Sequence, residues 1–151
     1  MKLFICGIPG TGKTTIGNSL EKHYGFLHID LEGPLFGEVE NLSLVFFERL
    51  VKNTNNIVIT WGFPPEESSL EIARYLKDNG FTCVWFDGNR EAARSVFKKR
   101  GTVSEDMFDI QVKSIDEKNV LRKIRPLCYN TFQENGRFKK EGVIIHQLFH
   151  L

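Results

Sequence analysis

The sequence has little of what would direct it to a membrane, to a nucleic acid or out of the cell. Its 151 residues carry 20 Lys and Arg against 19 Asp and Glu, so no net charge attracts a polyanion or an anionic lipid surface. The longest apolar runs are far shorter than a bilayer span, and the first residues lack the apolar core and cleavage site of a signal peptide. We therefore expect a cytoplasmic protein that binds neither nucleic acid nor membrane.

Cysteine is scarce, and its pattern indicates neither a disulfide framework nor a zinc site. Cys6, Cys83 and Cys128 are odd in number and far apart, and each lies in an apolar segment. We expect them to be buried, reduced thiols. His146 and His150 are four residues apart on an expected C-terminal helix, but no further ligand accompanies them, so the pattern does not favour a metal site.

The chain also lacks repeats, linkers and low-complexity segments, which predicts one domain over residues 1–151. Short apolar strands alternate with helices five times. This alternation is typical of an α/β fold with a five-stranded parallel sheet and helices on both faces, in which ligands bind at the carboxyl ends of the strands. Strands are expected at 3–6, 26–29, 57–61, 83–86 and 126–132, and helices at 14–24, 42–51, 66–78, 90–99, 104–122 and 139–150.

What the sequence does contain is a complete phosphate-binding motif at residues 7–14, hereafter the phosphate loop. They read Gly-Ile-Pro-Gly-Thr-Gly-Lys-Thr and fill every fixed position of G-x-x-x-x-G-K-[ST], between an apolar strand and a helix. The glycines let backbone N–H groups turn toward a polyphosphate, the lysine supplies a cation and the threonine hydroxyl is a ligand for Mg²⁺. The residues expected to bind a nucleotide are Gly7, Pro9, Gly10, Thr11, Gly12, Lys13, Thr14 and Thr15.

The order of these elements resembles the P-loop kinases of small molecules and nucleotides, the group of adenylate, shikimate and gluconate kinases. The resemblance implies the strand order 2-3-1-4-5 and transfer of the γ phosphate of ATP, with Mg²⁺, to a small acceptor. It also implies an acceptor-binding segment at about 31–67 and places residues 130–136 near the adenine. The choice of ATP or GTP, the acceptor, and a monomeric or homodimeric state stay open.

The same resemblance assigns catalytic roles. Asp30, which ends the second strand, would touch the hydroxyl that accepts the phosphate. A basic segment followed by residues 107–111 is similar to the lid and the next helix of gluconate-type kinases, which implies a short lid at about 98–104. The catalytic residues expected on this basis are Lys13, Asp30, Arg94 and Arg100.

The third strand departs from the family pattern. The Asp-Gly-Phe-Pro motif of adenylate kinases reads Trp61-Gly62-Phe63-Pro64 here, so Trp61 replaces the acid that would support the metal. Asp87, at the end of the fourth strand, is the expected substitute beside the metal ligand Thr14, and its alternative role is a turn before Gly88. The missing acid favours a second interpretation, a nucleotide-binding NTPase or regulatory protein that has no small acceptor.

The acceptor-binding segment carries six acids but only two bases, Arg49 and Lys52. A phosphorylated acceptor would require bidentate arginines, and only Arg49 is available there. The composition therefore favours a neutral or cationic acceptor with a hydroxyl group over a nucleoside monophosphate. The residues expected to bind the acceptor are Asp30, Glu32, Arg49, Gly62 and Phe63.

Several of these residues have a simpler alternative role. Asp30 would stabilise the turn that follows it, and Glu32 would be a solvated acid. Arg94 and Arg100 would lie on a solvated basic helix face. Phe63 would belong to the core, as aromatic side chains more often do.

Overall fold

A parallel β-sheet forms the centre of the protein, which we describe from a computed structural model for residues 1–33, 44–101 and 105–151, without the side chains of 44–47, 100 and 105. The described sheet has five strands in the order β2-β3-β1-β4-β5, and each neighbouring pair is parallel. The strand order that the resemblance implied is confirmed. The strands are β1 (Lys2–Gly7), β2 (Leu27–Asp30), β3 (Ile57–Trp61), β4 (Thr82–Asp87) and β5 (Leu127–Asn130).

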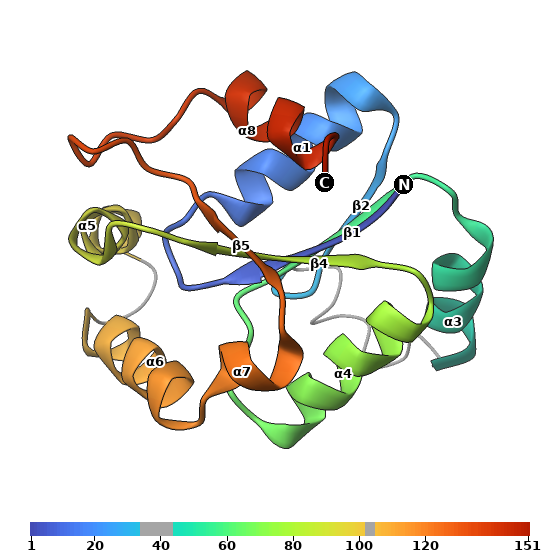
Figure 1. The fold of residues 1–151 in the computed structure, drawn as a ribbon, viewed down its shortest axis with the longest axis horizontal. Helices are drawn as coiled ribbons and strands as arrows, with labels where there is room; N and C mark the ends of the chain where they lie inside the picture. Colours follow the sequence, from blue (N-terminus) through green and yellow to red (C-terminus); the bar gives the residue numbers. More distant parts are fainter. Residues whose placement is uncertain (34–43, 102–104) are drawn as a thin grey trace.

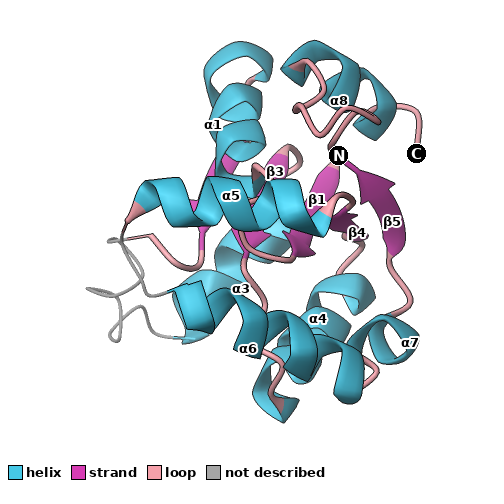
Figure 2. Ribbon diagram, turned by 90° about the vertical axis from the view of Figure 1, so that its left-hand side faces the viewer, coloured by secondary structure: helices cyan, strands magenta, loops and turns pink. Residues whose placement is uncertain are grey.

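Helices cover both faces of this sheet (Figure 1). In the view of Figure 1, α1 and α8 lie above the sheet, α3, α4, α6 and α7 lie below it, and α5 lies at the end toward which β1 and β4 run. Figure 2 looks onto that end and shows α5 crossing it. The helices are α1 (Lys13–Tyr24), α3 (Leu44–Asn53), α4 (Glu67–Asp78), α5 (Arg90–Arg100), α6 (Glu105–Glu117), α7 (Val120–Ile124) and α8 (Glu141–Leu148).

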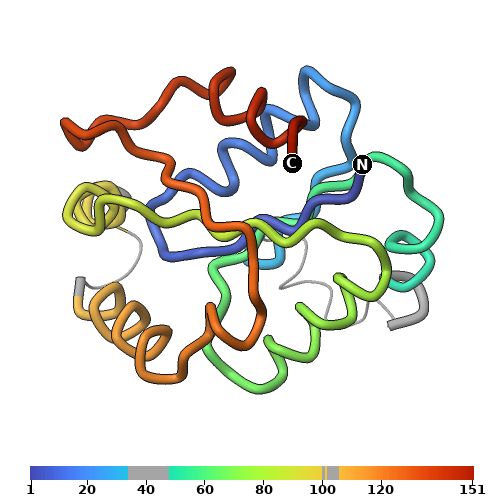
Figure 3. Tube along the Cα trace, in the orientation of Figure 1, coloured from blue at the N-terminus to red at the C-terminus, as the bar shows by residue number. Residues whose placement is uncertain are grey.

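Side chains alternate along β1 between two apolar layers. Leu3 and Ile5 pack with α1 and α8, whereas Phe4 and Cys6 pack with the helices on the opposite face. The Cα trace shows that α1 and α8, the early and late helices of the chain, run side by side (Figure 3). Burial on both faces explains why the central strands are continuous apolar runs.

The helix expected at 104–122 is two helices, and that prediction was wrong. Asn119 has φ 52° between α6 and α7, a left-handed conformation that Asn tolerates better than most residues. The break redirects the chain so that Val120 and Ile124, the ends of α7, become buried in the core. Packing of these two side chains decides the boundary, which the helical pattern alone did not reveal.

The fifth strand is shorter than expected and lies at the edge of the sheet. Because β5 has a single neighbour, β4, its side chains are mostly exposed, and Leu127 is 50% exposed. The prediction that all three cysteines are buried is therefore wrong for Cys128, which is exposed, while Cys6 and Cys83 are buried. After β5 the chain makes the expected turn near Gly136 and pairs Phe132 with Phe138.

Within the described residues, no helix combines the length and the apolar character that a bilayer crossing requires.

Candidate phosphate-transfer site

The phosphate loop joins β1 to α1 and fits against two neighbouring backbones. A Cβ on Gly7, which has φ 145°, would collide with the carbonyl of Phe86 in β4. A Cβ on Gly10, with φ 75°, would collide with the carbonyl of Ala93 in α5. The loop therefore needs glycine at these positions both for its backbone conformation and for close packing.

Lys13 holds its ammonium group at the loop. The side chain is 7% exposed, and its Nζ donates to the carbonyl oxygens of Gly7, at 3.1 Å, and Ile8, at 2.8 Å. Thr11 reinforces the same turn, because its Oγ1 donates to the Ile8 carbonyl at 2.8 Å. The cation is thus positioned by the backbone that a polyphosphate would contact.

Asp30 connects the end of β2 to the start of α1. Its Oδ2 accepts a hydrogen bond of 2.8 Å from the Thr14 hydroxyl, and its Oδ1 accepts one of 3.1 Å from the Glu32 backbone N–H. Asp30 therefore makes the turn that was its alternative role and also contacts the phosphate loop, while its contact with an acceptor hydroxyl stays a prediction. Thr14 and Asp30 present adjacent hard oxygen atoms, a donor set that fits Mg²⁺, which takes few protein ligands and retains water and phosphate oxygens.

The third strand carries a polar network that the sequence pattern did not reveal. Thr60 is fully buried, and its Oγ1 lies 2.9 Å from Nε2 of His28, whose Nδ1 lies 2.9 Å from Oδ1 of Asn18. A neutral ring protonated on Nδ1 satisfies both contacts, donating to Asn18 and accepting from Thr60. Burial lowers the pKa of His28 below its ordinary value. The negative charges of Asp30 and Glu21 act in the opposite direction and raise this pKa, but by less.

Phe63 is part of the core, so the prediction that it forms a wall for the acceptor is wrong. Its side chain is fully buried and packs edge-on against Trp85, with ring centroids 5.8 Å apart. Trp61, which replaces the expected acid, packs in the same way against Phe63 at 5.4 Å. The burial of the Phe63 ring among these aromatics outweighs the unusual φ of 55° at this residue.

Gly62, between Trp61 and Phe63 of this aromatic cluster, is buried and lies against the carboxylate of Glu32. A Cβ on Gly62 would collide with Oε1 of Glu32, so the missing side chain makes room for the acid. The Gly62 carbonyl accepts a hydrogen bond of 2.7 Å from Nε2 of Gln111. Two of the predicted acceptor-binding residues are therefore neighbours, and α6 contributes a third polar group beside them.

A cavity of about 210 Å³, hereafter the Glu32 cavity, lies between these groups and the phosphate loop. Three of its side chains, from α5 and α6, were not among the predicted site residues. Residues 107–111 had been recognised only as the helix after the lid, and nothing local marked them as a cavity wall. The lining residues are Pro9, Gly10, Gly12, Lys13, Thr14, Glu32, Gly62, Phe97, Met107 and Gln111.

The basic residues predicted for catalysis or acceptor binding are not brought together in the described part of the chain. Arg94 makes a bidentate ion pair with Asp109 of α6, at 3.1 and 2.8 Å, and so joins α5 to α6. Arg49 lies exposed on α3. The Arg100 side chain, and residues 102–104 of the predicted lid, lie outside the described residues, so those assignments stay predictions.

Asp87 makes the turn that was its alternative role. Its Oδ1 accepts a hydrogen bond of 2.8 Å from the Gly88 N–H, and its Oδ2 lies 3.7 Å from Arg90, which also binds Asp116 through two hydrogen bonds. Its assignment to the metal stays a prediction. In the described residues, no group of three His, Cys, Asp or Glu side chains could hold a metal ion.

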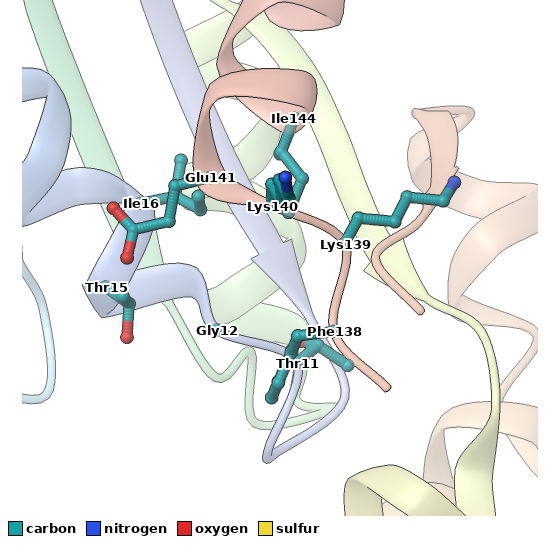
Figure 4. A pocket seen from close by; sticks show the side chains of 9 residues that line it. All are labelled: Thr11, Gly12, Thr15, Ile16, Phe138, Lys139, Lys140, Glu141 and Ile144. Atoms are coloured by element: carbon teal, nitrogen blue, oxygen red, sulfur yellow. The ribbon is translucent and has the colours of Figure 1, made fainter. Parts of the chain in front are cut away.

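A second cavity, the Phe138 cavity, lies on another side of the phosphate loop and has a volume of about 280 Å³ (Figure 4). The ring of Phe138 stacks on Phe132 with centroids 4.5 Å apart and approaches Gly12, at 3.3 Å from where a Cβ would stand. The cavity begins just after residues 130–136, which were expected near the adenine. Its lining residues are Thr11, Gly12, Thr15, Ile16, Phe138, Lys139, Lys140, Glu141 and Ile144.

Comparison with known proteins agrees with this geometry. No family model matches the chain. A shikimate kinase from Persephonella marina is 25% identical over 158 aligned positions, which cover 94% of this chain and 85% of that protein. The solved shikimate kinase of Bacteroides thetaiotaomicron superposes with a TM-score of 0.63 at 16% identity, over 100% of this chain and 99% of that one. This is the fold of the shikimate kinases.

A second solved structure shows that the fold is also similar to that of a gluconokinase. A gluconokinase from Sinorhizobium meliloti superposes with a TM-score of 0.57 at 16% identity, covering 99% of this chain and 95% of its own. The chain is thus similar to P-loop small-molecule kinases of the shikimate and gluconate type, as its sequence indicated.

Proposed function

We propose that the protein is an ATP-dependent kinase that transfers the γ phosphate, with Mg²⁺, to a hydroxyl group of a small acceptor. The observation that carries this proposal is the hydrogen bond of 2.8 Å between Thr14 and Asp30. It holds a carboxylate from the end of β2 against the hydroxyl of the phosphate loop, beside the Glu32 cavity. Thr14 is itself part of the cavity lining, so the acid stands one hydrogen bond away from the space that an acceptor would occupy.

The arrangement of the cavities supports this proposal. Gly12 lines both the Phe138 cavity and the Glu32 cavity, so the phosphate loop lies between two spaces. A nucleotide base and ribose would occupy the first and an acceptor the second, with the γ phosphate between them at Lys13. Holding the two reactants in line on either side of the transferred group is the main task of a phosphoryl-transfer enzyme.

The residues then have distinct roles in the transfer. The acceptor oxygen forms a bond to the γ phosphorus while the bond from that phosphorus to the oxygen of the departing ADP breaks. Asp30 orients the acceptor hydroxyl and takes its proton. Lys13 and the loop N–H groups stabilise the phosphate oxygens. Thr14 would hold Mg²⁺, which would neutralise charge on the phosphates when bound.

The proposal is tested with purified protein and Mg·ATP. The melting temperature is first measured with a non-hydrolysable ATP analogue, and ADP formation is then measured with pools of sugars, polyols, acids, nucleosides, nucleotides and aminoglycosides. We expect the nucleotide to raise the melting temperature and one pool to raise ADP formation, with a phosphorylated acceptor found by mass spectrometry. The variant Lys13→Ala should lose both effects.

A second candidate function is that of a nucleotide-binding NTPase without a small acceptor. Trp61 favours it, because this residue stands where the related kinases carry an acid and packs into the aromatic cluster instead. In that case ADP would form at a rate that no pool changes, and no phosphorylated product would appear.

A further inference from the structure

The charge of the Glu32 cavity is negative away from the phosphate loop. Among the residues that the structure describes, the charged side chains in its lining are Lys13 and Glu32. Lys13 is directed to the carbonyl oxygens of Gly7 and Ile8 and belongs to the phosphate-binding part of the wall. What remains for an acceptor is the Glu32 carboxylate, the amide of Gln111 and apolar surface.

Glu32 is exposed to solvent, but its backbone is fixed in the turn after β2. Its backbone N–H donates to Asp30, and the next residue, Gly33, donates to the Asp30 carbonyl at 3.0 Å, so the turn after β2 is closed on both sides. The carboxylate then lies against Gly62. A residue larger than glycine at position 62 would place its Cβ where the carboxylate is. The negative charge therefore stands beside Gly62, just after β3, and the Gly62 carbonyl is bound by Gln111.

The described lining of the cavity offers no arginine to an anionic acceptor. On the neighbouring helix α5, Arg90 and Arg94 are each bound in bidentate fashion by a carboxylate of α6, Asp116 and Asp109. From the side chains that the structure describes, a carboxylate or phosphate group placed in the cavity would therefore meet Glu32 and no guanidinium to balance it, which costs binding free energy.

We propose that the phosphate acceptor is a small hydroxyl compound that carries a protonated amine, and that Glu32 binds this amine while Asp30 binds the reacting hydroxyl. This inference rests on the proposed kinase function and names its substrate class. The ammonium group pairs with the carboxylate and the carbon skeleton contacts Phe97 and Met107. The cavity of about 210 Å³ suits a molecule of monosaccharide size and is below the range of about 300–1,000 Å³ typical of drug-sized sites.

The test uses sets of probes that are similar in size and differ in the charge of one substituent. One set is D-glucosamine, D-glucose and D-glucuronate, and another is 3-amino-1,2-propanediol, glycerol and glycerate, with shikimate and gluconate as further acids. Melting temperature and dissociation constants are measured with Mg²⁺ and the non-hydrolysable ATP analogue held constant. We expect an amine to add to the nucleotide-induced stabilisation more than its neutral counterpart, and the acids to add nothing.

Variants of Glu32 test whether its carboxylate causes the preference for amines. Glu32→Gln should weaken binding of the amine by about tenfold, the size expected for a hydrogen bond to a charged group, and leave the nucleotide shift unchanged. Glu32→Lys should reverse the preference toward the acid of the same set. Glu71→Gln removes an exposed acid of α4, outside the cavity lining, and should leave the amine preference as it is.

Two kinds of outcome separate this inference from the kinase proposal. If the nucleotide stabilises the protein but no amine exceeds its matched acid, or if Glu32→Gln keeps the full amine preference, the inference is wrong while the kinase stands. A phosphorylated carboxylic acid as product would lead to the same conclusion. If the nucleotide analogue does not raise the melting temperature at all, the kinase proposal fails and the inference fails with it.

Discussion

The imidazole ring of His28 occupies the space beside the Cα of Gly17. A Cβ on this helical glycine would collide with three atoms of the ring. The ring cannot move aside freely, because its two nitrogens are engaged by Asn18 and Thr60. Gly17 therefore lets α1 approach β2 closely, and its lack of a side chain is a packing requirement rather than a helix defect.

We predict that Gly17→Ala destabilises the protein by about 1–3 kcal/mol, as overpacking a filled site usually does. The measurement is the free energy of unfolding from urea titration. In a His28→Ala background the same substitution should be neutral or stabilising, because alanine is the better helix former by up to about 1 kcal/mol. Gly142→Ala in α8, where a Cβ meets nothing within 4 Å, is the matched control and should stabilise. Equal effects at both glycines would contradict the packing explanation.

The pKa of His28 predicts a loss of stability in mild acid. Burial lowers this pKa in the folded state relative to the ordinary value of 6.5. Below that value the unfolded chain binds the proton more readily than the folded one, so stability falls as the pH decreases from about 6.5 through the folded pKa. Urea midpoints measured between pH 8 and pH 5 should show this decrease in the wild type. They should show a weaker one in His28→Gln, with the exposed His23→Gln as control.

Asp30→Asn should reduce phosphoryl transfer at least about a hundredfold, because the amide cannot take the proton of the acceptor hydroxyl. Nucleotide binding should change little, since the substitution keeps an oxygen near Thr14. The measurement is kcat for the acceptor found by the screen, alongside the nucleotide-induced rise in melting temperature. The surface variant Asp78→Asn controls for loss of charge. A kcat within threefold of the wild type would remove Asp30 from the proton transfer.

Phe138→Ala should weaken nucleotide binding by about tenfold, if the exposed ring stacks on the base as aromatic side chains often do. Isothermal titration with the ATP analogue measures this change. Phe149→Ala is the control, because Phe149 is exposed to a similar degree and packs instead on Tyr24 and Phe26. If the two variants bind nucleotide equally well, the base does not use this ring.

The parts of the fold that depend on local pattern were predictable from the sequence. The phosphate loop is recognised from its glycines in the sequence. The central strands are recognised as apolar runs because they are buried on both faces. The position of Asp30 at the end of the second strand was implied by the resemblance to the P-loop kinases, and the residue does bind Thr14 of the loop. The turn near Gly136 also follows from its own residues.

The parts that depend on packing between distant segments were not predictable. Gln111 reaches Gly62 only because α6 folds beneath the end of β3. Phe63 follows a ligand-binding motif in sequence, yet the aromatic cluster draws its ring into the core. Cys128 lies in an apolar segment, and its exposure follows from the position of β5 at the sheet edge. Spacing along the chain contains none of this information.

Among the described residues the two cavities share one lining residue, Gly12, and apart from the phosphate loop and the start of α1 their walls come from different elements. The turn after β5 and the start of α8 contribute to the Phe138 cavity, while the ends of β2 and β3, together with α5 and α6, contribute to the Glu32 cavity. Under the proposed kinase function, the choice of phosphate donor and the choice of acceptor would therefore be separable in this scaffold. Exchanging Glu32, Phe97, Met107 and Gln111 alone would then redirect the protein to a new acceptor without disturbing its nucleotide preference.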